Sequence, residues 1–218
     1  MCTRYLPPEQ AAIESYWQVT PGQALRWPSQ VFPRAQGPFL RASGPGLPLV
    51  LAAGQFGLIP WFAKTLPLTF ATQNARFEGI TGKASFKKAW QRGQRCLIPA
   101  MAFDEPCWET GKNVWWRFRR TDGAPWGLAG LWNAWVDPAT GEIVNSYTML
   151  TINADHHPVM RRMHKPDPKL APDQQDKRSV VAIEPADLAV WLHGTPDEAS
   201  ALITPPSEDI LLAGPAEP

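Results

Sequence analysis

Prolines are spread along the whole chain, and they limit it to short secondary-structure elements. There are 24 of them in 218 residues, about twice the usual ~5%. A proline interrupts the hydrogen bonding of a helix and of a central strand, so the sequence predicts many turns and no long helices. Hydrophobic residues make up 44% of the chain, which is enough to build the core of one sizeable domain.

Short apolar segments between turns predict strands through most of the sequence. Apolar and basic side chains alternate in residues 113–120, which is the period of a strand with two different faces. Phe86 and Trp90 lie four residues apart with lysines between them, which indicates a short amphipathic helix. The expected strands lie in residues 23–27, 38–43, 94–103, 113–120, 125–136, 143–154 and 179–185, and the expected helices lie in residues 8–19, 84–92 and 185–192. Residues 47–64 indicate a strand, a glycine turn and a second apolar element closed by Pro60.

These elements predict one α+β domain over residues 1–206. Successive strands are separated by short gaps, so a mostly antiparallel, barrel-like β core with a few short helices fits better than βαβ units. The remaining residues, 207–218, contain prolines and acidic side chains. We expect this C-terminal tail to fray.

Charge and cysteine content narrow the classes of function. The formal net charge is +1, so any attraction to nucleic acid must come from a local basic surface. Cys2, Cys96 and Cys107 form no CxxC pair, which argues against a disulfide framework and a zinc site. No apolar run approaches ~18–20 residues, and residues 1–16 do not resemble a signal peptide. We therefore expect a cytoplasmic protein with no cofactor, metal or membrane partner.

Cys2 is the first candidate for chemistry. If Met1 is removed, an α-amine with a pKa of ~7.7–8 and a thiol with a pKa of ~8.5 lie on adjacent carbons. The amine can form a Schiff base with an aldehyde, and the thiol can then close a five-membered thiazolidine ring. The same residue suits the N-terminal nucleophile of amide hydrolysis. By position alone, however, a small packing residue in a strand is the simpler interpretation.

Two further segments carry polar groups suited to a reaction site. Asn74, Arg76 and Glu78 alternate in "QNARFE" and would share one face of a strand. Together they could bind a phosphate and orient a carbonyl, although a solvated strand face has the same pattern. Asp104 and Glu105 follow an apolar strand and are flanked by aromatic residues. Such a carboxylate suits acid–base work, and an acidic turn is the alternative.

Three of the four histidines lie in "NADHHPVMRRMHKP", which also holds two arginines. The spacing of His156, His157 and His164 matches no common zinc motif, so a metal site is not expected. A histidine beside Arg161 and Arg162 would be a proton donor in a phosphate-binding setting.

Seven segments follow one another along the chain: "MCTRY", "FGLIPWFAK", "NARFE", "RCLIPAMAFDE", "GLAGLW", "YTMLTINA" and the histidine–arginine block. In this order, from Cys2 to about Leu192, they resemble the SRAP (SOS-response-associated peptidase) family. The chain departs from the family pattern at three places. It has Thr3 where the family has glycine and Phe56 where the family has tryptophan. After Glu105 it has Pro106 and Cys107 where the family has tryptophan. It also has no intact HxRMP motif.

This resemblance implies a barrel-like α+β fold, binding of single-stranded DNA and covalent coupling to abasic sites through an N-terminal cysteine. An autocatalytic peptidase that removes the initiating Met is also attributed to the family, and a lyase activity is a further expectation. By matching motif, Cys2 is the nucleophile, Asn74 and Arg76 belong to "NAR", and Glu105 is the catalytic carboxylate.

The catalytic histidine has two alignments. Matching "RRM" to the family's "xRM" would put Met160 at the histidine position. The alternative takes His164 as the histidine, treats the following residues as an insertion, and gives Arg178 the role of the motif's arginine. We favour His164, because this alignment keeps a histidine and places a basic residue before a strand; His156 and His157 remain alternatives.

The resulting hypothesis is a trap for abasic sites. His164 assists opening of the sugar ring, the Cys2 amine attacks C1′, Glu105 moves protons, and Asn74 holds the sugar or the Cys2 backbone. The expected partner is single-stranded DNA with abasic sites, bound by a monomer that is nucleoid-associated while on DNA. A cysteine peptidase and a simple DNA-binding module are the alternatives. The residues expected to contact DNA are Arg4, Trp61, Phe62, Arg76, Arg161, Arg162 and Arg178.

Overall fold

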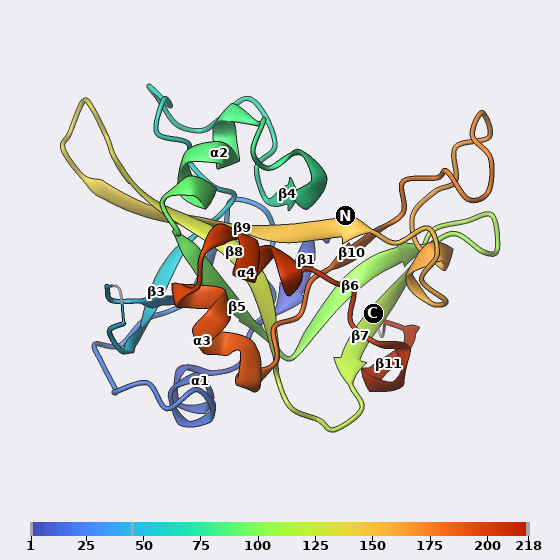
Figure 1. Ribbon diagram of the computed structural model, residues 1–218, viewed down its shortest axis with the longest axis horizontal. Helices are drawn as coiled ribbons and strands as arrows, with labels where there is room; N and C mark the ends of the chain where they lie inside the picture. Colours follow the sequence, from blue (N-terminus) through green and yellow to red (C-terminus); the bar gives the residue numbers. More distant parts are fainter. Residues whose placement is uncertain (1, 45, 217–218) are drawn as a thin grey trace.

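A closed ring of five strands forms the centre of the protein (Figure 1). The computed structural model describes residues 2–44 and 46–216. The strands follow the order β9–β3–β2–β5–β8, and β8 pairs back with β9. All neighbours in the ring are antiparallel except β3 and β9. The ring comprises β2 (Gln36–Ala42), β3 (Leu49–Phe56), β5 (Arg95–Ala100), β8 (Trp126–Val136) and β9 (Ile143–Asn153).

A second, fully antiparallel sheet packs beside the ring, in the order β1–β6–β7–β11. The α+β class and the barrel-like core are thereby confirmed. Asp104 and Glu105 lie within a strand of this sheet, so the acidic-turn interpretation was wrong. The strands are β1 (Arg4–Leu6), β6 (Ala102–Cys107), β7 (Val114–Arg120) and β11 (Leu211–Pro215).

The expected C-terminal tail is ordered up to residue 215, where a frayed end was expected. Part of it forms β11, which pairs with β7 from Leu211 opposite Arg120 to Pro215 opposite Trp116. This pairing supplies hydrogen-bond partners to a strand that would otherwise be an exposed sheet edge. Residues 217 and 218 of the expected tail lie outside the described residues.

The strands of the ring pack into two cores because successive side chains point to opposite faces. Leu97 of β5 packs with the helices, in a cluster that includes Trp90 and Trp191. Its neighbour Ile98 packs instead with residues of the second sheet, including Phe103. Every residue of β5 is buried, as expected of a strand covered on both faces.

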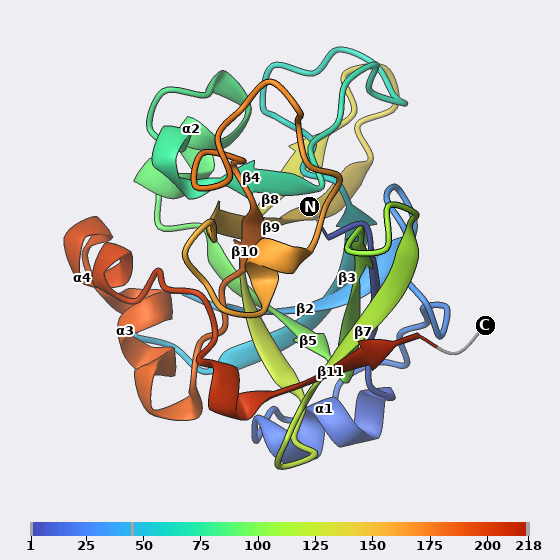
Figure 2. The ribbon, with the colours of Figure 1, turned by 90° about the vertical axis from the view of Figure 1, so that its right-hand side faces the viewer.

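Short helices cover the outside of the ring, and Figure 2 shows α3 and α4 on one side of it and β7 and β11 on the other. One expected strand is absent: in residues 23–27, the Leu25 N–H donates to Gln10 Oε1 and the Trp27 indole N–H donates to the Pro8 carbonyl. The segment therefore bonds to the α1 region, not to a sheet. No described helix combines the length and apolar character needed to cross a membrane. The helices are α1 (Gln10–Tyr16), α2 (Ala84–Gln91), α3 (Leu188–His193) and α4 (Pro196–Ala201), with 3-10 turns η1 (Phe77–Gly79), η2 (Met160–Arg162), η3 (Pro185–Asp187) and η4 (Glu208–Ile210).

Two short strands flank the end of β9 and prepare the site. β4 (Asn74–Arg76) pairs with β9 in parallel, and β10 (Arg178–Val180) pairs with it antiparallel. Thr151 of β9 lies opposite Arg76 on one side and Val180 on the other. Residues from "NARFE" and from the segment after the histidines, about a hundred positions apart, therefore lie side by side.

Candidate active site

Cys2 is enclosed between the second sheet and β4. Strand β1 pairs with β6, with Arg4 opposite Asp104, and this pairing carries Cys2, two residues before the first residue of β1, into the interior. Asn74 of β4 donates from Nδ2 to the Cys2 carbonyl over 2.7 Å. The thiol donates to the Arg4 carbonyl over 3.4 Å, and no part of Cys2 is exposed to solvent. The backbone and the side chain of Cys2 are both held in one orientation.

The environment of Cys2 keeps its thiol protonated. Burial, reinforced by the negative charge of Glu105, raises the pKa of the Cys2 thiol well above its usual range. A buried thiolate beside a carboxylate would lack the hydration that stabilises it in water. The thiol can therefore act as a nucleophile only as its proton is passed to a base. Of the two carboxylates that act on the thiol, Glu105 and Asp104, Glu105 has the larger effect.

Glu105 and His164 form a hydrogen-bonded pair. Glu105 is buried on β6, and its Oε2 lies 2.9 Å from Nε2 of His164, whose side chain is partly exposed. A carboxylate that orients an imidazole at the boundary with solvent is suited to moving protons between a substrate and the interior. The structure brings Cys2, Asn74, Glu105 and His164 together; their catalytic roles stay predictions.

The backbone of His164 is clamped in an unusual conformation. Its φ is +62°, a left-handed value that costs a non-glycine residue of order 1–3 kcal/mol. Its N–H donates to the Pro106 carbonyl over 2.6 Å. The buried ammonium group of Lys177 donates to the carbonyls of His164 (2.6 Å) and Met163 (2.7 Å). Burial lowers the pKa of Lys177, against the opposing charge of Asp155.

The three alternative positions for the catalytic histidine, His157, His156 and Met160, lie in different environments. Nδ1 of His157 accepts the backbone N–H groups of Val159 and Met160, and its Nε2 lies 2.8 Å from the Pro206 carbonyl. These bonds hold the turn that begins η2. His156 is exposed, and Met160 is buried in the core.

An open cleft of about 700 Å³ adjoins this cluster, and Asn74 is part of its wall. It lies between β4, the start of α2 and the end of β9. Arg76 and Lys83 are exposed and bring positive charge to the cleft, which suits an anionic strand. The lining residues are Ala71, Asn74, Arg76, Glu78, Gly79, Lys83, Ala84, Ser85, Phe86, Asn153, Asp176 and Arg178.

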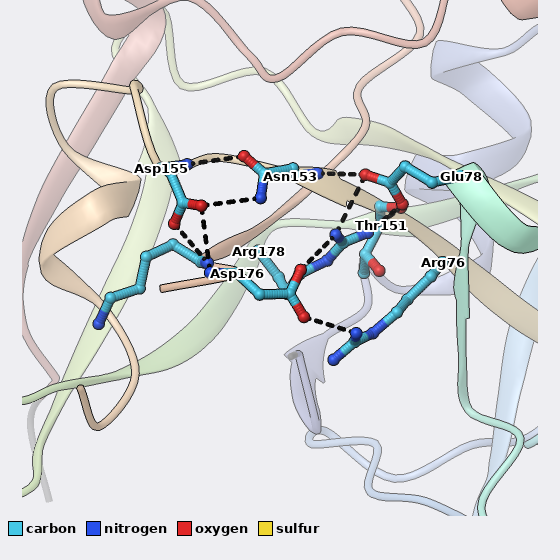
Figure 3. Close-up of polar contacts among 8 residues, drawn as sticks. Arg76, Glu78, Thr151, Asn153, Asp155, Asp176 and Arg178 are labelled. Atoms are coloured by element: carbon cyan, nitrogen blue, oxygen red, sulfur yellow. Dashed lines mark hydrogen bonds and ion pairs between the residues drawn. The ribbon is translucent and has the colours of Figure 1, made fainter. Parts of the chain in front are cut away.

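Figure 3 shows the polar network among residues that line this cleft, in which Asp176 bridges Arg76 and Arg178. Arg178 is only 4% exposed and bonds to Glu78 Oε2 (2.7 Å), Asp176 Oδ1 (3.0 Å) and the Thr151 carbonyl (2.9 Å). Arg76 has an exposed side chain and meets Asp176 Oδ2 at 2.5 Å. Although burial acts to raise it, hydrogen bonds from Arg178 and the Asn153 N–H hold the pKa of Glu78 below its usual value. The positive charge of buried Arg178 is therefore offset by Glu78 and Asp176. Arg76 is the more accessible of the two arginines that line the cleft.

Arg4 is tied to a buried carboxylate. Asp104 is fully buried and accepts two hydrogen bonds from Arg117, at 2.9 and 3.0 Å, while Arg4 Nε lies 2.5 Å from its Oδ2. The Arg4 guanidinium also lies over the Trp115 ring, 5.1 Å from its centre. One carboxylate thus joins β1, β6 and β7 beside Cys2.

The remaining residues expected to contact DNA lie at the surface. Trp61 and Phe62 are exposed and meet edge to face, and the Lys88 ammonium lies 3.2 Å from the centre of the Trp61 ring. Arg162 bonds Glu109 through two nitrogens, each at 2.7 Å, and lies over Trp116. Arg161 is exposed on η2 and has no ion pair among the described contacts.

Sequence reasoning missed Lys83, Arg117, Asp176 and Lys177. Asp176 and Lys177 follow His164 in the part of the chain where no family motif was recognised. The one signal for a role in the site was that they directly precede Arg178. Arg117 is one of several alternating basic residues, and only the pairing of β7 with β6 puts it opposite Asp104. Within residues 2–44 and 46–216, no cluster of three or more histidine, cysteine or acidic side chains could hold a metal ion.

Comparisons with known proteins agree with the fold and the motif order. A model of the family described as SOS response associated peptidase (SRAP) matches residues 1–216. A crystal structure of a protein from Bordetella bronchiseptica superposes with a TM-score of 0.84 at 35% identity, covering 99% of this chain and 100% of that one. A structure from Bacteroides thetaiotaomicron, at 18% identity and a TM-score of 0.71 over 99% and 92% of the two chains, shares the fold.

Curated relatives match over parts of their length. The abasic site processing protein HMCES of Xenopus tropicalis is 30% identical over 127 residues, which are 48% of this chain and 37% of the relative. The abasic site processing protein YoaM of Bacillus subtilis is 27% identical over 161 residues, 71% of this chain and 63% of the relative. The match thus spans about one to two thirds of these relatives. With the family model matching nearly its whole length, the chain belongs to the SOS response associated peptidase (SRAP) family.

Proposed function

We propose that the protein binds single-stranded DNA and, after removal of Met1, traps abasic sites covalently through Cys2, protecting the lesion. The observation that carries the proposal is the enclosure of Cys2 by Asn74, with the Glu105–His164 pair in the same cluster. Relatives named abasic site processing proteins support the choice of substrate.

The reaction follows from the functional groups. An abasic sugar is a cyclic hemiacetal in equilibrium with an open-chain aldehyde, and His164 moves the proton that accompanies ring opening. The Cys2 amine adds to C1′, and loss of one water from the carbinolamine leaves a C=N bond. The thiol then adds across this bond: sulfur bonds to C1′, the thiol proton passes to nitrogen through Glu105, and the thiazolidine ring closes.

The order of the two attacks follows from the site. The raised pKa of the thiol keeps sulfur protonated, whereas a free α-amine has a pKa of ~7.7–8 and is partly unprotonated at neutral pH. The amine therefore reacts first, and sulfur adds once the aldehyde carbon is held beside it. Asn74 fixes the Cys2 carbonyl, which keeps the amine and the thiol aimed at one point.

The cleft supplies the binding surface for the strand. Arg76 and Lys83 contact phosphates, and Arg178 supports Arg76 through Asp176. Arg4, Arg161 and Arg162 add positive charge around the lesion, and Trp61 and Phe62 offer stacking surfaces to bases. Binding should weaken with salt in proportion to the few phosphates contacted.

A denaturing gel tests the proposal. Protein shown by mass to begin at Cys2 is mixed with a single-stranded oligonucleotide that carries one abasic site, or with the intact oligonucleotide. We expect a slower band only with the abasic strand, and its loss in Cys2→Ala. Absence of this band would sink the proposal. Cleavage of added peptides would favour the alternative, a cysteine peptidase acting on itself or on other proteins, for which the family description is the supporting observation.

Lys177→Met tests the clamp on His164. At saturating DNA, the rate of covalent capture should fall by about tenfold to a hundredfold, because small displacements of a reacting group have effects of this size. Affinity for intact DNA should stay unchanged. Lys169→Met, an exposed lysine of the same segment, is the matched control. Equal rates for the two variants would show that Lys177 does not position His164.

A further inference from the structure

A second basic cavity lies at the far end of α2 from the active-site cleft. It has a volume of about 430 Å³ and lies between the end of β2, the loop from α2 to β5 and the end of α3. Its ionisable side chains are Arg41, Arg92, Arg95 and His193, and no described carboxylate lines it. None of these four residues has been used by the proposed reaction.

Two of these arginines are withdrawn from solvent, and neither has an acidic partner among the residues that the structure describes. Arg95 is 3% exposed; it donates to the carbonyls of Trp191 and Gly194. Arg41 is half-buried over the Trp132 ring, at 4.4 Å, and donates to the Ala42 carbonyl over 3.2 Å. By contrast, the other described arginines with largely buried side chains all have carboxylate partners; they are Arg4, Arg117, Arg120 and Arg178.

The two guanidinium groups have unused hydrogen-bonding capacity. Nη1 of Arg95 and Nε of Arg41 are buried and have no hydrogen-bond partner among the described residues. Burial lowers the pKa of both side chains, as expected where no nearby anion offsets the loss of hydration. A buried positive charge of this kind is stabilised by an anion.

His193 adds a hydrogen-bond donor to the lining of the second cavity. Its Nδ1 accepts the N–H of Gly46 over 3.2 Å, so the neutral ring carries its proton on Nε2. Arg92 is exposed beside it. Arginine side chains that form a fork of N–H groups are well matched to phosphate oxygens.

One face of α2 connects this cavity to the cleft. Ser85, Lys88 and Arg92 are spaced by three and four residues and so lie on one face, over a rise of about 10 Å. Ser85 lines the active-site cleft, whereas Arg92 lines the second cavity. A shallow hollow between them is lined by all three residues and by Trp61. The positive charge and the exposed aromatic ring therefore form a continuous track.

We propose that the second cavity is a phosphate site, which holds a backbone phosphate of the single strand as it continues from the cleft along α2. Arg41 and Arg92 contact the phosphate, Arg95 provides charge beneath it, and Trp61 stacks on a base on the way. This inference rests on the proposed function for the identity of the strand. It extends the DNA-binding surface beyond the reacting nucleotide.

Binding of intact oligonucleotides of two lengths tests the inference without any covalent step. In fluorescence anisotropy, Arg41→Gln and Arg92→Gln should each weaken binding of a 20-nucleotide oligothymidine by about tenfold, the usual size of a charged hydrogen bond. The slope of log K against log salt should decrease by about 0.7 for each lost contact. Binding of a four-nucleotide strand, which fills only the cleft, should not change.

Controls separate this inference from its alternatives. Arg26→Gln should leave both affinities unchanged, because Arg26 is exposed and lines neither cavity nor the hollow between them. Arg92 lies on the surface, so its variant remains folded even if Arg41→Gln does not. Wild-type affinity of both variants for the long strand would overturn the inference. So would stabilisation of the wild type, but not of Arg41→Gln, by inorganic phosphate with no change in DNA binding, because the cavity would then hold a free phosphate compound. Failure of abasic capture alone would contradict the proposed function and leave this result standing.

Discussion

Glu105→Gln should lower the rate of covalent capture of abasic DNA by about 10²–10⁴-fold, the range that general acid–base groups contribute. Glutamine keeps the size of the side chain and can still bond to His164, whose Nε2 lies 2.9 Å from Glu105 Oε2. It cannot accept the proton that the Cys2 thiol must lose. Because Glu105 is buried away from the strand, affinity for intact DNA should stay near the wild-type value.

Single-turnover kinetics with a large excess of protein measure this rate directly. Glu109→Gln is the matched control, since Glu109 lies four residues away on the surface and pairs with Arg162. A Glu105→Gln rate within a few-fold of the control would show that Glu105 is not the proton acceptor. If Glu105 and His164 act as one unit, His164→Gln should lower the rate of covalent capture of abasic DNA by about as much as Glu105→Gln.

Asp104→Ala should lower the free energy of unfolding by about 3–5 kcal/mol, because removing one partner of a buried ion pair leaves uncompensated charge. Asp104 is fully buried, and both Arg4 and Arg117 depend on it. Chemical denaturation followed by tryptophan fluorescence gives the measurement. The change should also slow capture, since β1 positions Cys2 through the Arg4–Asp104 pairing.

Asp122→Ala is the comparison for this prediction. Asp122 also pairs with an arginine, Arg120, but its side chain is 52% exposed, and exposed ion pairs contribute little to stability. Its removal should hardly move the unfolding transition. Equal destabilisation by the two substitutions would contradict a special role for the buried pair.

Local patterns predicted two of the main strands. Residues 113–120, where apolar and basic side chains alternate, form β7 close to the expected position, because successive side chains of a strand point to opposite faces. The apolar run in residues 125–136 forms β8, whose first six residues are all buried. The prediction for residues 23–27 failed because the Gln10 side chain bonds to the Gln23 carbonyl and to the Leu25 N–H, two backbone groups that a strand would use. The strand β11 was not expected, although Leu211 and Leu212 are apolar, because the prolines and acidic residues of the tail indicated a frayed end. Its pairing with the edge of β7 orders it.

In the site, too, residues within recognisable motifs could be predicted, whereas contacts between distant parts of the chain could not. Motif order predicted Asn74 and Glu105, and the alignment that keeps a histidine favoured His164. The structure brings all three together with Cys2. No local pattern could reveal that Asp176 would bridge Arg76 and Arg178, because that contact depends on β4 and β10 flanking β9. The clamp of Lys177 on the backbone of His164 likewise depends on the path of the whole segment between them.

The central claim is that Cys2 supplies both nucleophiles to one carbon, and intact mass spectrometry tests it most directly. Protein beginning at Cys2 is mixed with a single-stranded abasic oligonucleotide, denatured, and weighed before and after borohydride treatment. We predict an adduct with the mass of protein plus oligonucleotide minus one water, unchanged by borohydride because the thiazolidine has no C=N bond. Cys2→Ser, which keeps the amine, should yield an adduct only when borohydride is present during the reaction. A wild-type adduct that requires borohydride, or one that Cys2→Ser forms equally well without it, would contradict the account.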